Sequence, residues 1–146
     1  MTGDGSIHMN LQELQTILTN KLPIKFFVIN NEGYHSIRQT QTNIFNKNFH
    51  GIGEQSGDLG FPSMEKLAAA YGYPYYRIDT NSGMGRIDDV LSESGAAICE
   101  VFVNTVQIFE PKSATKKMPD GSLYSPPLED MAPFLDREEL ERNMYE

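Results

Sequence analysis

Residues 24–33 of the chain read Ile-Lys-Phe-Phe-Val-Ile-Asn-Asn-Glu-Gly. The apolar run at 24–29, interrupted by a single lysine, is typical of a strand buried on both faces of a sheet. The polar residues at 30–33 predict a tight turn directly after this strand. Together they indicate a parallel sheet whose strand ends open into polar loops.

Helical and strand-like patterns alternate on both sides of this strand. Leu11, Leu14, Ile17 and Leu18 share one face of a helix predicted at 10–20. The other expected elements are a helix or helical loop at 34–45, a glycine-rich loop at 50–60, helices at 62–71 and 85–93, and strands at 75–78 and 96–103. The alternation predicts an α/β fold in three layers, with a parallel sheet covered by helices on both faces.

The two ends of the chain depart from this regular pattern. Met1-Thr2 runs directly into Gly3-Asp4-Gly5-Ser6, and a glycine-flanked Asp usually lies in a turn after a strand. We therefore expect the domain to lack its first strand. After Val103 the sequence is rich in proline and has little periodicity. We expect a domain at 1–103 and an extended tail at 104–146, with a short helix at 136–144.

The bulk composition limits the classes of partner. The 146 residues suit one domain, and the formal net charge of −8 disfavours nucleic acid and anionic membrane surfaces. No apolar run is long enough to span a bilayer, and the N-terminus lacks a signal-peptide pattern, so a cytoplasmic location is the expectation. Cys99, the single cysteine, lies in an apolar strand-like run and is interpreted as an inert core thiol.

Polar residues lie in two turns that are expected at the same edge of the sheet, each at a position where a strand of the fold ends. Asp4 lies in the first turn and Asn31 in the second. Neighbouring parallel strands lie about 5 Å apart, so these side chains can approach one ion. A carboxylate, an amide oxygen and the Gly33 carbonyl are oxygen ligands that suit Mg²⁺. Gly3 and Gly5 would let the backbone approach a phosphate, and the helix beginning after Ser6 would direct its amides at the same anion.

These paired motifs resemble the diphosphate-binding signature of thiamine-diphosphate-dependent enzymes, most closely the acetolactate-synthase-like decarboxylases and carboligases. The likeness rests on residues 3–6 (Gly-Asp-Gly-Ser), 9–14 (Met-Asn-Leu-Gln-Glu-Leu) and 28–34 (Val-Ile-Asn-Asn-Glu-Gly-Tyr). It continues through the helix at 62–71, the strand at 96–103 and Gln107. The resemblance implies the thiamine-diphosphate-binding fold, with thiamine diphosphate and Mg²⁺ as cofactors.

The resemblance also implies roles for particular residues. Asp4, Asn31 and the carbonyl of Gly33 would bind Mg²⁺. The cofactor would be contacted by Gly3, Asp4, Gly5, Ser6, Asn31, Gly33, Tyr34 and His35. The family usually carries Met and Trp in the helix after the Asn pair, whereas Thr40 takes the Trp position here, which puts the acetolactate reaction itself in doubt.

Four basic residues near these motifs are interpreted separately. His35 suits a proton-transferring group over the substrate, or a loop histidine packed beside Tyr34. Arg38 suits a substrate carboxylate or an exposed helix position. A structural role is favoured for His8, and a solvated loop position for His50.

The resemblance thus implies the diphosphate- and Mg²⁺-binding portion of a decarboxylase or carboligase that acts on a small-molecule 2-keto acid. The carboxylate that activates the cofactor is expected in a missing pyrimidine-binding domain or a second subunit, so the isolated chain should be inactive. Any FAD site is expected outside this chain, and a homo-oligomer, most simply a dimer, is predicted. The alternatives are a non-catalytic assembly or regulatory module and a flavodoxin-like phosphate or nucleotide binder.

Overall fold

The structure of the protein is a computed structural model, which describes residues 1–144. The chain divides into two compact units, one spanning Met1–Thr105 and the other beginning at Val106. The first unit holds the sheet and the candidate site. None of the helices within residues 1–144 is long and apolar enough to cross a membrane.

The first unit is built on a four-stranded parallel sheet with the strand order β1-β2-β4-β3. The strands are β1 (Thr2–Gly3), β2 (Lys25–Asn30), β3 (Tyr75–Ile78) and β4 (Ala97–Phe102). The register places Gly3 beside Ile29, and Cys99 between Phe27 and Tyr76. Because all four strands are parallel, their carboxyl ends open at one edge of the sheet.

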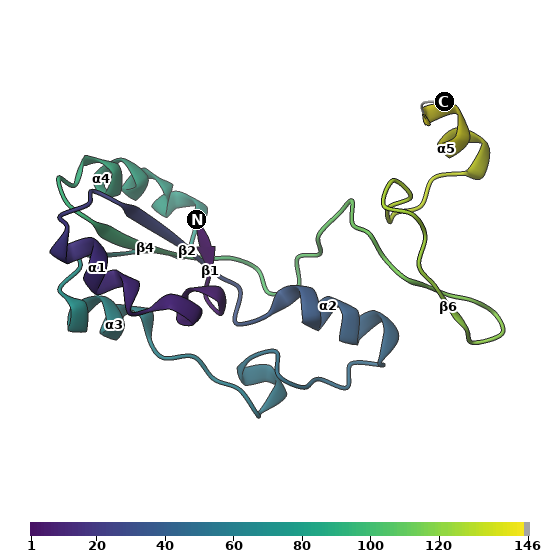
Figure 1. The fold of residues 1–146 in the computed structure, drawn as a ribbon, viewed down its shortest axis with the longest axis horizontal. Helices are drawn as coiled ribbons and strands as arrows, with labels where there is room; N and C mark the ends of the chain where they lie inside the picture. Colours follow the sequence, from purple (N-terminus) through teal and green to yellow (C-terminus); the bar gives the residue numbers. More distant parts are fainter. Residues whose placement is uncertain (145–146) are drawn as a thin grey trace. The chain divides into compact units, whose positions relative to one another are not determined.

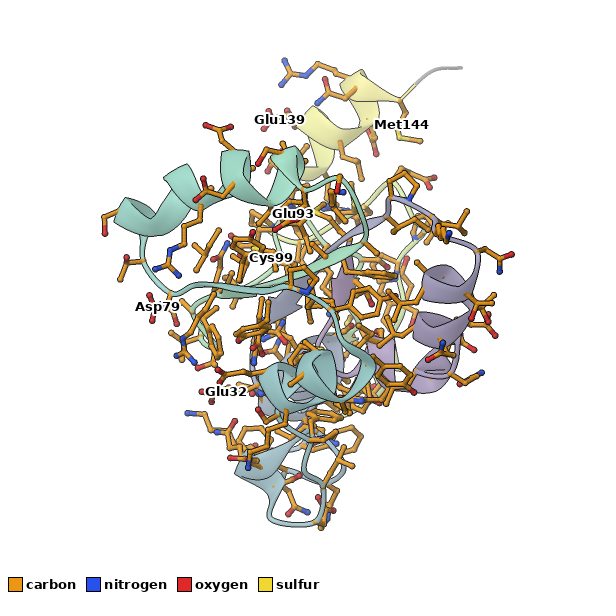
Figure 2. The ribbon with its side chains drawn as sticks, turned by 90° about the vertical axis from the view of Figure 1, so that its left-hand side faces the viewer. Glu32, Asp79, Glu93, Cys99, Glu139 and Met144 are labelled. Atoms are coloured by element: carbon orange, nitrogen blue, oxygen red, sulfur yellow. The ribbon has the colours of Figure 1, made fainter. Side chains whose placement is uncertain are left out.

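Helices cover both faces of this sheet, which confirms the predicted three-layer α/β fold. Figure 1 shows α1 (Glu13–Thr19) and α3 (Met64–Tyr71) on one side and α4 (Arg86–Ser92) on the other. On the first face, Leu14 and Ala68 pack against Val28 and Ile98 of the sheet. On the opposite face the core contains Ile78, Val90, Ala97 and Cys99. Cys99 is fully buried among the side chains beneath α4 (Figure 2).

The helix boundaries follow from local capping. The side chain of Ser63 accepts a hydrogen bond from the Lys66 amide and begins α3, although the expected start was Pro62. Gly72 ends α3 in the left-handed region with φ 84°. The predicted helix at 10–20 is shorter, because Ser6–Asn10 form a 3₁₀ helix (η1) before α1 begins at Glu13.

Two further 3₁₀ helices join the other elements. Glu54–Ser56 (η2) lies in the glycine-rich loop, and Asn81–Gly85 (η3) leads into α4. The segment predicted as a helix or helical loop after the Asn pair is the helix α2 (His35–Ile44).

The first strand differs from the expectation. The sequence led us to expect that it is missing, but Thr2 and Gly3 pair in parallel with Val28 and Ile29 as the short strand β1. Two residues are too few to form a periodic pattern, so this strand cannot be recognised from periodicity. The consequence is that Asp4 directly follows a strand of the sheet.

The second unit contains a small hairpin that the sequence analysis did not predict. Its strands are β5 (Lys116–Lys117) and β6 (Leu123–Tyr124), and a helix, α5 (Arg137–Asn143), follows them. The buried Asp130 receives two hydrogen bonds from Arg137, at 2.7 and 2.9 Å, and lies 3.7 Å from the Lys116 Nζ. The Lys116 ammonium also lies 3.6 Å from the centre of the Phe134 ring. This unit is therefore organised around one buried carboxylate.

Candidate functional site

The ends of β1 and β2 lie side by side, which brings Asp4 next to residues Asn30, Asn31, Glu32 and Gly33, called here the 30–33 turn. The Asp4 amide donates to the Ile29 carbonyl at 3.0 Å. Asp4 is 6% exposed, and its carboxylate accepts hydrogen bonds from the amides of Gly5 at 2.9 Å and Gly33 at 2.8 Å. The carboxylate is thus held in one orientation by two backbone donors from two loops.

Burial raises the pKa of Asp4 above its usual value, although the Gly33 and Gly5 amides act in the opposite direction. The raised pKa shows that a negative charge at this position is not fully compensated by its protein neighbours. A cation bound to the remaining carboxylate lone pairs would supply that compensation. This property fits the Mg²⁺ that the resemblance implies.

The ligand chemistry around Asp4 also limits the kind of ion. Within residues 1–144 no group of three or more His, Cys, Asp or Glu side chains could hold a metal. An ion at Asp4 would therefore need amide and backbone oxygens, which are ligands suited to Mg²⁺ and not to zinc. The Asn31 side chain and the Gly33 carbonyl, on the adjacent turn, are oxygens of that class.

The 30–33 turn has an unusual backbone that requires glycine. Gly33 has φ 126°, and a Cβ there would lie 1.8 Å from the Ile52 carbonyl oxygen. Gly53 has φ 137°, and a Cβ there would lie 2.5 Å from the Glu32 carbonyl oxygen. Tyr34 donates its amide to Ile52 at 2.8 Å. The turn and the glycine-rich loop therefore touch backbone to backbone.

Arg38 of α2 stabilises the same turn through hydrogen bonds to its backbone. It is 6% exposed, and its guanidinium donates to the carbonyls of Asn31 at 2.9 Å and Glu32 at 2.5 Å. The reading of Arg38 as an exposed helix residue is therefore wrong. Its planar fork is occupied by the two carbonyls, which gives it a structural role that neither sequence reading anticipated.

Aromatic rings pack around the amino-terminal loop. A Cβ on Gly5 would lie 2.5 Å from the Tyr34 ring, so the absence of a side chain at Gly5 makes room for Tyr34. Tyr34 meets Phe61 edge-on at 5.5 Å, and Phe61 stacks on His8 at 5.3 Å. A Cβ on Gly3 would meet only ordinary contacts, the nearest being Ser6 Oγ at 3.8 Å.

The three histidines lie in different environments. His8 is stacked as described, and burial lowers its pKa. His35 begins α2, is 7% exposed, and has its Nδ1 3.5 Å from Arg38 Nη1, so it is a buried helix residue and not a loop residue. His50 is exposed, and its Nδ1 lies 3.7 Å from Asp58.

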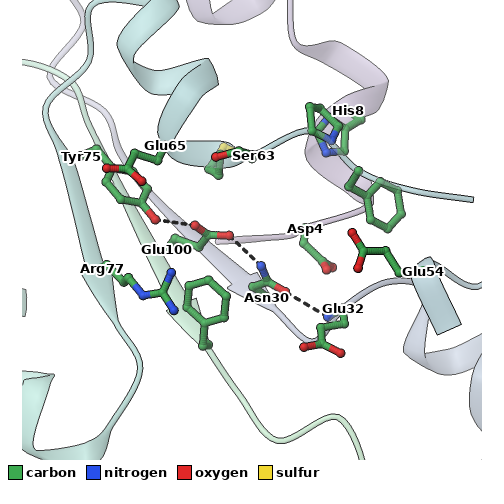
Figure 3. A pocket seen from close by; sticks show the side chains of 14 residues that line it. Asp4, His8, Asn30, Glu32, Glu54, Ser63, Glu65, Tyr75, Arg77 and Glu100 are labelled. Carbon is green, nitrogen blue, oxygen red and sulfur yellow. Dashed lines mark hydrogen bonds between the residues drawn. The ribbon is translucent and has the colours of Figure 1, made fainter.

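A cavity of about 270 Å³ opens at the carboxyl edge of the sheet (Figure 3). Asp4 is the only one of the predicted cofactor contacts that lines it, and Gly3, Gly5, Ser6, Asn31, Gly33, Tyr34 and His35 lie outside its lining. Its remaining lining includes His8, Asn30, Glu54, Phe61, Tyr75 and Glu100.

A hydrogen-bonded group of three residues in this cavity was not predicted from the sequence. The Asn30 amide donates to Glu100 Oε1 at 2.6 Å, and the Tyr75 hydroxyl donates to Glu100 Oε2 at 2.5 Å. A signal for Glu100 was present, because it is a lone charge inside the apolar run at 96–103. Its partners depend on strand register, which periodicity does not give.

Comparisons with known proteins show the family to which this chain belongs. The family described as thiamine pyrophosphate enzyme, C-terminal TPP binding domain, matches residues 1–101. The acetolactate synthase large subunit of Cyanidium caldarium is 32% identical over 118 residues, which cover 80% of this chain and 20% of that protein. The chloroplastic acetolactate synthase of Arabidopsis thaliana is 33% identical over 105 residues, covering 68% of this chain and 16% of that protein.

Solved structures show the same fold. The thiamine diphosphate-dependent 4-hydroxybenzoylformate decarboxylase of Rhodococcus jostii RHA1 superposes with a TM-score of 0.60 at 21% identity, over 70% of this chain and 19% of that chain. The benzoylformate decarboxylase of Polynucleobacter necessarius gives a TM-score of 0.59 at 23% identity, with the same coverage. The chain spans about a fifth of the length of these relatives. With its parallel sheet, its Asp4 turn and a family match over residues 1–101, the chain belongs to the thiamine pyrophosphate enzymes, as a C-terminal TPP-binding domain similar to that of acetolactate synthase.

Proposed function

We propose that this chain binds the diphosphate end of thiamine diphosphate (thiamine pyrophosphate) through Mg²⁺. The side chains of Asp4 and Asn31 and the carbonyl of Gly33 are the proposed metal ligands. Gly3, Gly5 and Ser6 contact the diphosphate, and Tyr34 and His35 lie along the cofactor. The observation that carries the proposal is the buried Asp4 carboxylate at the junction of two parallel strand ends.

The two backbone amides that donate to the Asp4 carboxylate orient it and leave it able to bind an ion. The Gly5 and Gly33 amides each occupy one lone pair of a different Asp4 oxygen. A carboxylate has about four lone-pair sites, so acceptor capacity remains for a cation. Since Arg38 holds the Asn31 and Glu32 carbonyls, the oxygens of the turn that remain for an ion include the Asn31 side chain and the Gly33 carbonyl.

The whole protein is proposed to be a decarboxylase or carboligase that acts on 2-keto acids. When bound, thiamine diphosphate supplies the electron sink that lets a 2-keto acid lose carbon dioxide. The role of this chain is to anchor the diphosphate and so to fix the position of the cofactor. The group that activates the cofactor is assigned to another domain or a second subunit.

The second candidate is an assembly or regulatory module without catalysis. It is favoured by large apolar side chains on the second unit, such as Val106 and Leu128, which are 77% and 78% exposed. Surfaces of this kind are typical of association.

Calorimetry with thiamine diphosphate and Mg²⁺ tests the binding proposal. Asp4→Asn is expected to abolish the Mg²⁺-dependent part of binding, because it removes the charge and sets an amide donor against a backbone N–H. Asp58→Asn is the matched control, since Asp58 also accepts a glycine amide, that of Gly51, at 3.0 and 3.1 Å, but in an exposed loop. Equal loss in both variants, or binding that Asp4→Asn leaves intact, would contradict the proposal.

A further inference from the structure

Three neighbouring strands carry a continuous chain of side-chain hydrogen bonds that ends at the 30–33 turn. Tyr75 in β3 donates its hydroxyl to Glu100 in β4, and Asn30 at the end of β2 donates its amide to the same carboxylate. Figure 3 shows the three side chains in line, with Asn30 also joined to Glu32. Glu100 is only 6% exposed, in a strand that is otherwise apolar.

The chemistry of the carboxylate fixes the orientation of the Asn30 amide. Both oxygens of Glu100 accept hydrogen bonds, and a carboxylate has only acceptors to offer. Asn30 must therefore present its NH₂ group to Glu100, which leaves its Oδ1 free to accept. That oxygen accepts the backbone amide of Glu32 at 2.9 Å, two residues further on.

This last bond holds the turn in its unusual conformation. Glu32 has φ 58°, in the left-handed region that residues with a side chain rarely adopt. The bond from its amide to Asn30 stabilises that conformation from within the turn. The next amide, that of buried Gly33, is then directed at Asp4 Oδ2 at 2.8 Å.

We propose that Glu100 is a positioning residue for the Mg²⁺ and diphosphate site. Glu100 acts through Asn30, by selecting the amide orientation that shapes the turn presenting Asn31 and Gly33. Tyr75 supports it by occupying the second carboxylate oxygen. The inference rests on the proposed function for its link to the cofactor, but the effect on the turn exists without any ligand.

The hydrogen bonds that run from Tyr75 through Glu100 and Asn30 to Glu32 are called here the relay, and the sheet supplies a matched control for it. Tyr76 follows Tyr75 in β3, is also half-buried, and donates its hydroxyl to a carboxylate, that of Glu93. Successive residues of a strand face opposite sides of the sheet, so this second pair lies on the α4 side, away from the turn. Tyr75→Phe and Tyr76→Phe each remove one hydroxyl–carboxylate bond, and only the first belongs to the relay.

Calorimetric titration of the chain with thiamine diphosphate and Mg²⁺ measures the effect on binding. Tyr75→Phe is expected to weaken binding about fivefold, the equivalent of one net hydrogen bond, while Tyr76→Phe stays within about twofold of the wild type. Glu100→Gln is expected to stay within about threefold, because its side-chain oxygen can accept from Asn30 and the Tyr75 hydroxyl can rotate to accept its amide. Glu100→Leu leaves Asn30 without an acceptor and is expected to weaken binding at least about tenfold.

Amide hydrogen exchange of Gly33 gives a readout that needs no cofactor. Tyr75→Phe should accelerate exchange of this amide several-fold relative to amides in the centre of β4, and Tyr76→Phe should not. Equal effects of the two tyrosine substitutions, or no effect of Tyr75→Phe on the Gly33 amide, would overturn the inference. If Glu100→Leu does not fold, the comparison of Tyr75→Phe with Tyr76→Phe still tests the inference. If the wild type itself binds no cofactor, the proposed function fails, while the exchange comparison still tests the relay.

Discussion

The carboxylate of Asp4 accepts a hydrogen bond from the backbone amide of Gly33 at 2.8 Å, although the two residues are 29 positions apart in the sequence. The contact joins the loop after β1 to the turn after β2. It brings a charged side chain and a glycine with φ 126° into one small polar site. The stability of this site depends on backbone geometry as much as on side-chain chemistry, and that dependence can be measured.

Gly33→Ala is expected to destabilise the chain by roughly 3 kcal/mol, because it adds both backbone strain and a clash with the Ile52 carbonyl. Gly60→Ala is the control, since a Cβ at Gly60 meets nothing within 4 Å and its φ is not in the left-handed region. Urea unfolding curves of the two variants measure the difference. Equal midpoints would show that the turn can relax away from Ile52.

Arg38→Lys is expected to cost about 1–3 kcal/mol of stability, because a lysine cannot donate in a planar fork to two carbonyls. The exposed Arg77 offers a control: it pairs with Asp79 at 3.2 Å at the surface, and Arg77→Lys should change stability by less than about 0.5 kcal/mol. Thermal unfolding of both variants tests this. A wild-type midpoint for Arg38→Lys would mean that the two carbonyls do not need the guanidinium.

The second unit should respond to acid through Asp130. Hydrogen bonds from Arg137 hold the pKa of Asp130 below its ordinary value of 3.8. Because the folded pKa is the lower one, the stabilisation is complete above pH 3.8 and is lost as the pH falls through the folded pKa. NMR titration of the Asp130 carboxyl should show the low midpoint, and Arg137→Gln should raise it.

Asp120 provides the internal reference for that titration. Its pKa is also lowered, but by Ser122, so the Arg137 substitution should leave it unchanged. A shift of both carboxyls in Arg137→Gln would indicate that the unit has unfolded. An unchanged Asp130 midpoint would show that the ion pair does not form in solution.

The isolated chain is expected to release no carbon dioxide from pyruvate in the presence of thiamine diphosphate and Mg²⁺. The physical reason is that the group assigned to cofactor activation lies outside its residues. Measurement of carbon dioxide on the homogeneous chain tests this expectation. Turnover that persists after repurification, and that Asp4→Asn abolishes, would show that the chain is sufficient for catalysis.

Self-association is expected to involve the apolar residues of the second unit. Sedimentation at micromolar concentration should show a dimer, and Leu128→Asp should shift it toward the monomer, because Leu128 is 78% exposed. Leu91→Asp, at a 58% exposed position of α4, is the control and should leave the dimer intact. A wild-type monomer would contradict the prediction, and dissociation by Leu91→Asp alone would move the interface to α4.

The layered fold could be predicted because its signals are local. Strand β2 and helix α3 each carry a continuous pattern that their own residues determine, and parallel pairing follows from the alternation of the two kinds of element. The meeting of Asp4 with the 30–33 turn could be anticipated in the same way, because both follow strand ends at one edge.

The remaining contacts depend on information that periodicity does not carry. The partners of Glu100 depend on the register that sets Tyr75 beside Ile98, and Lys25 through Asn30 opposite the six residues of β4. Arg38 binds backbone carbonyls, which every residue has, so no partner residue type reveals it. The hairpin of β5 and β6 has two residues in each strand, too few for an alternating pattern.

The backbone contact between the turn at Gly33 and the loop at Gly53, called here the glycine crossing, has an evolutionary consequence. A Cβ on Gly33 would clash with the Ile52 carbonyl oxygen, and a Cβ on Gly53 would clash with the Glu32 carbonyl oxygen. Both clashes are with backbone atoms, which no side-chain substitution removes. A change at one position therefore cannot be compensated by a change at the other. Among homologues that keep this crossing, the two positions should each remain glycine independently, without pairwise covariation, and selection for suppressors of Gly33→Ala should recover reversion or altered loop length.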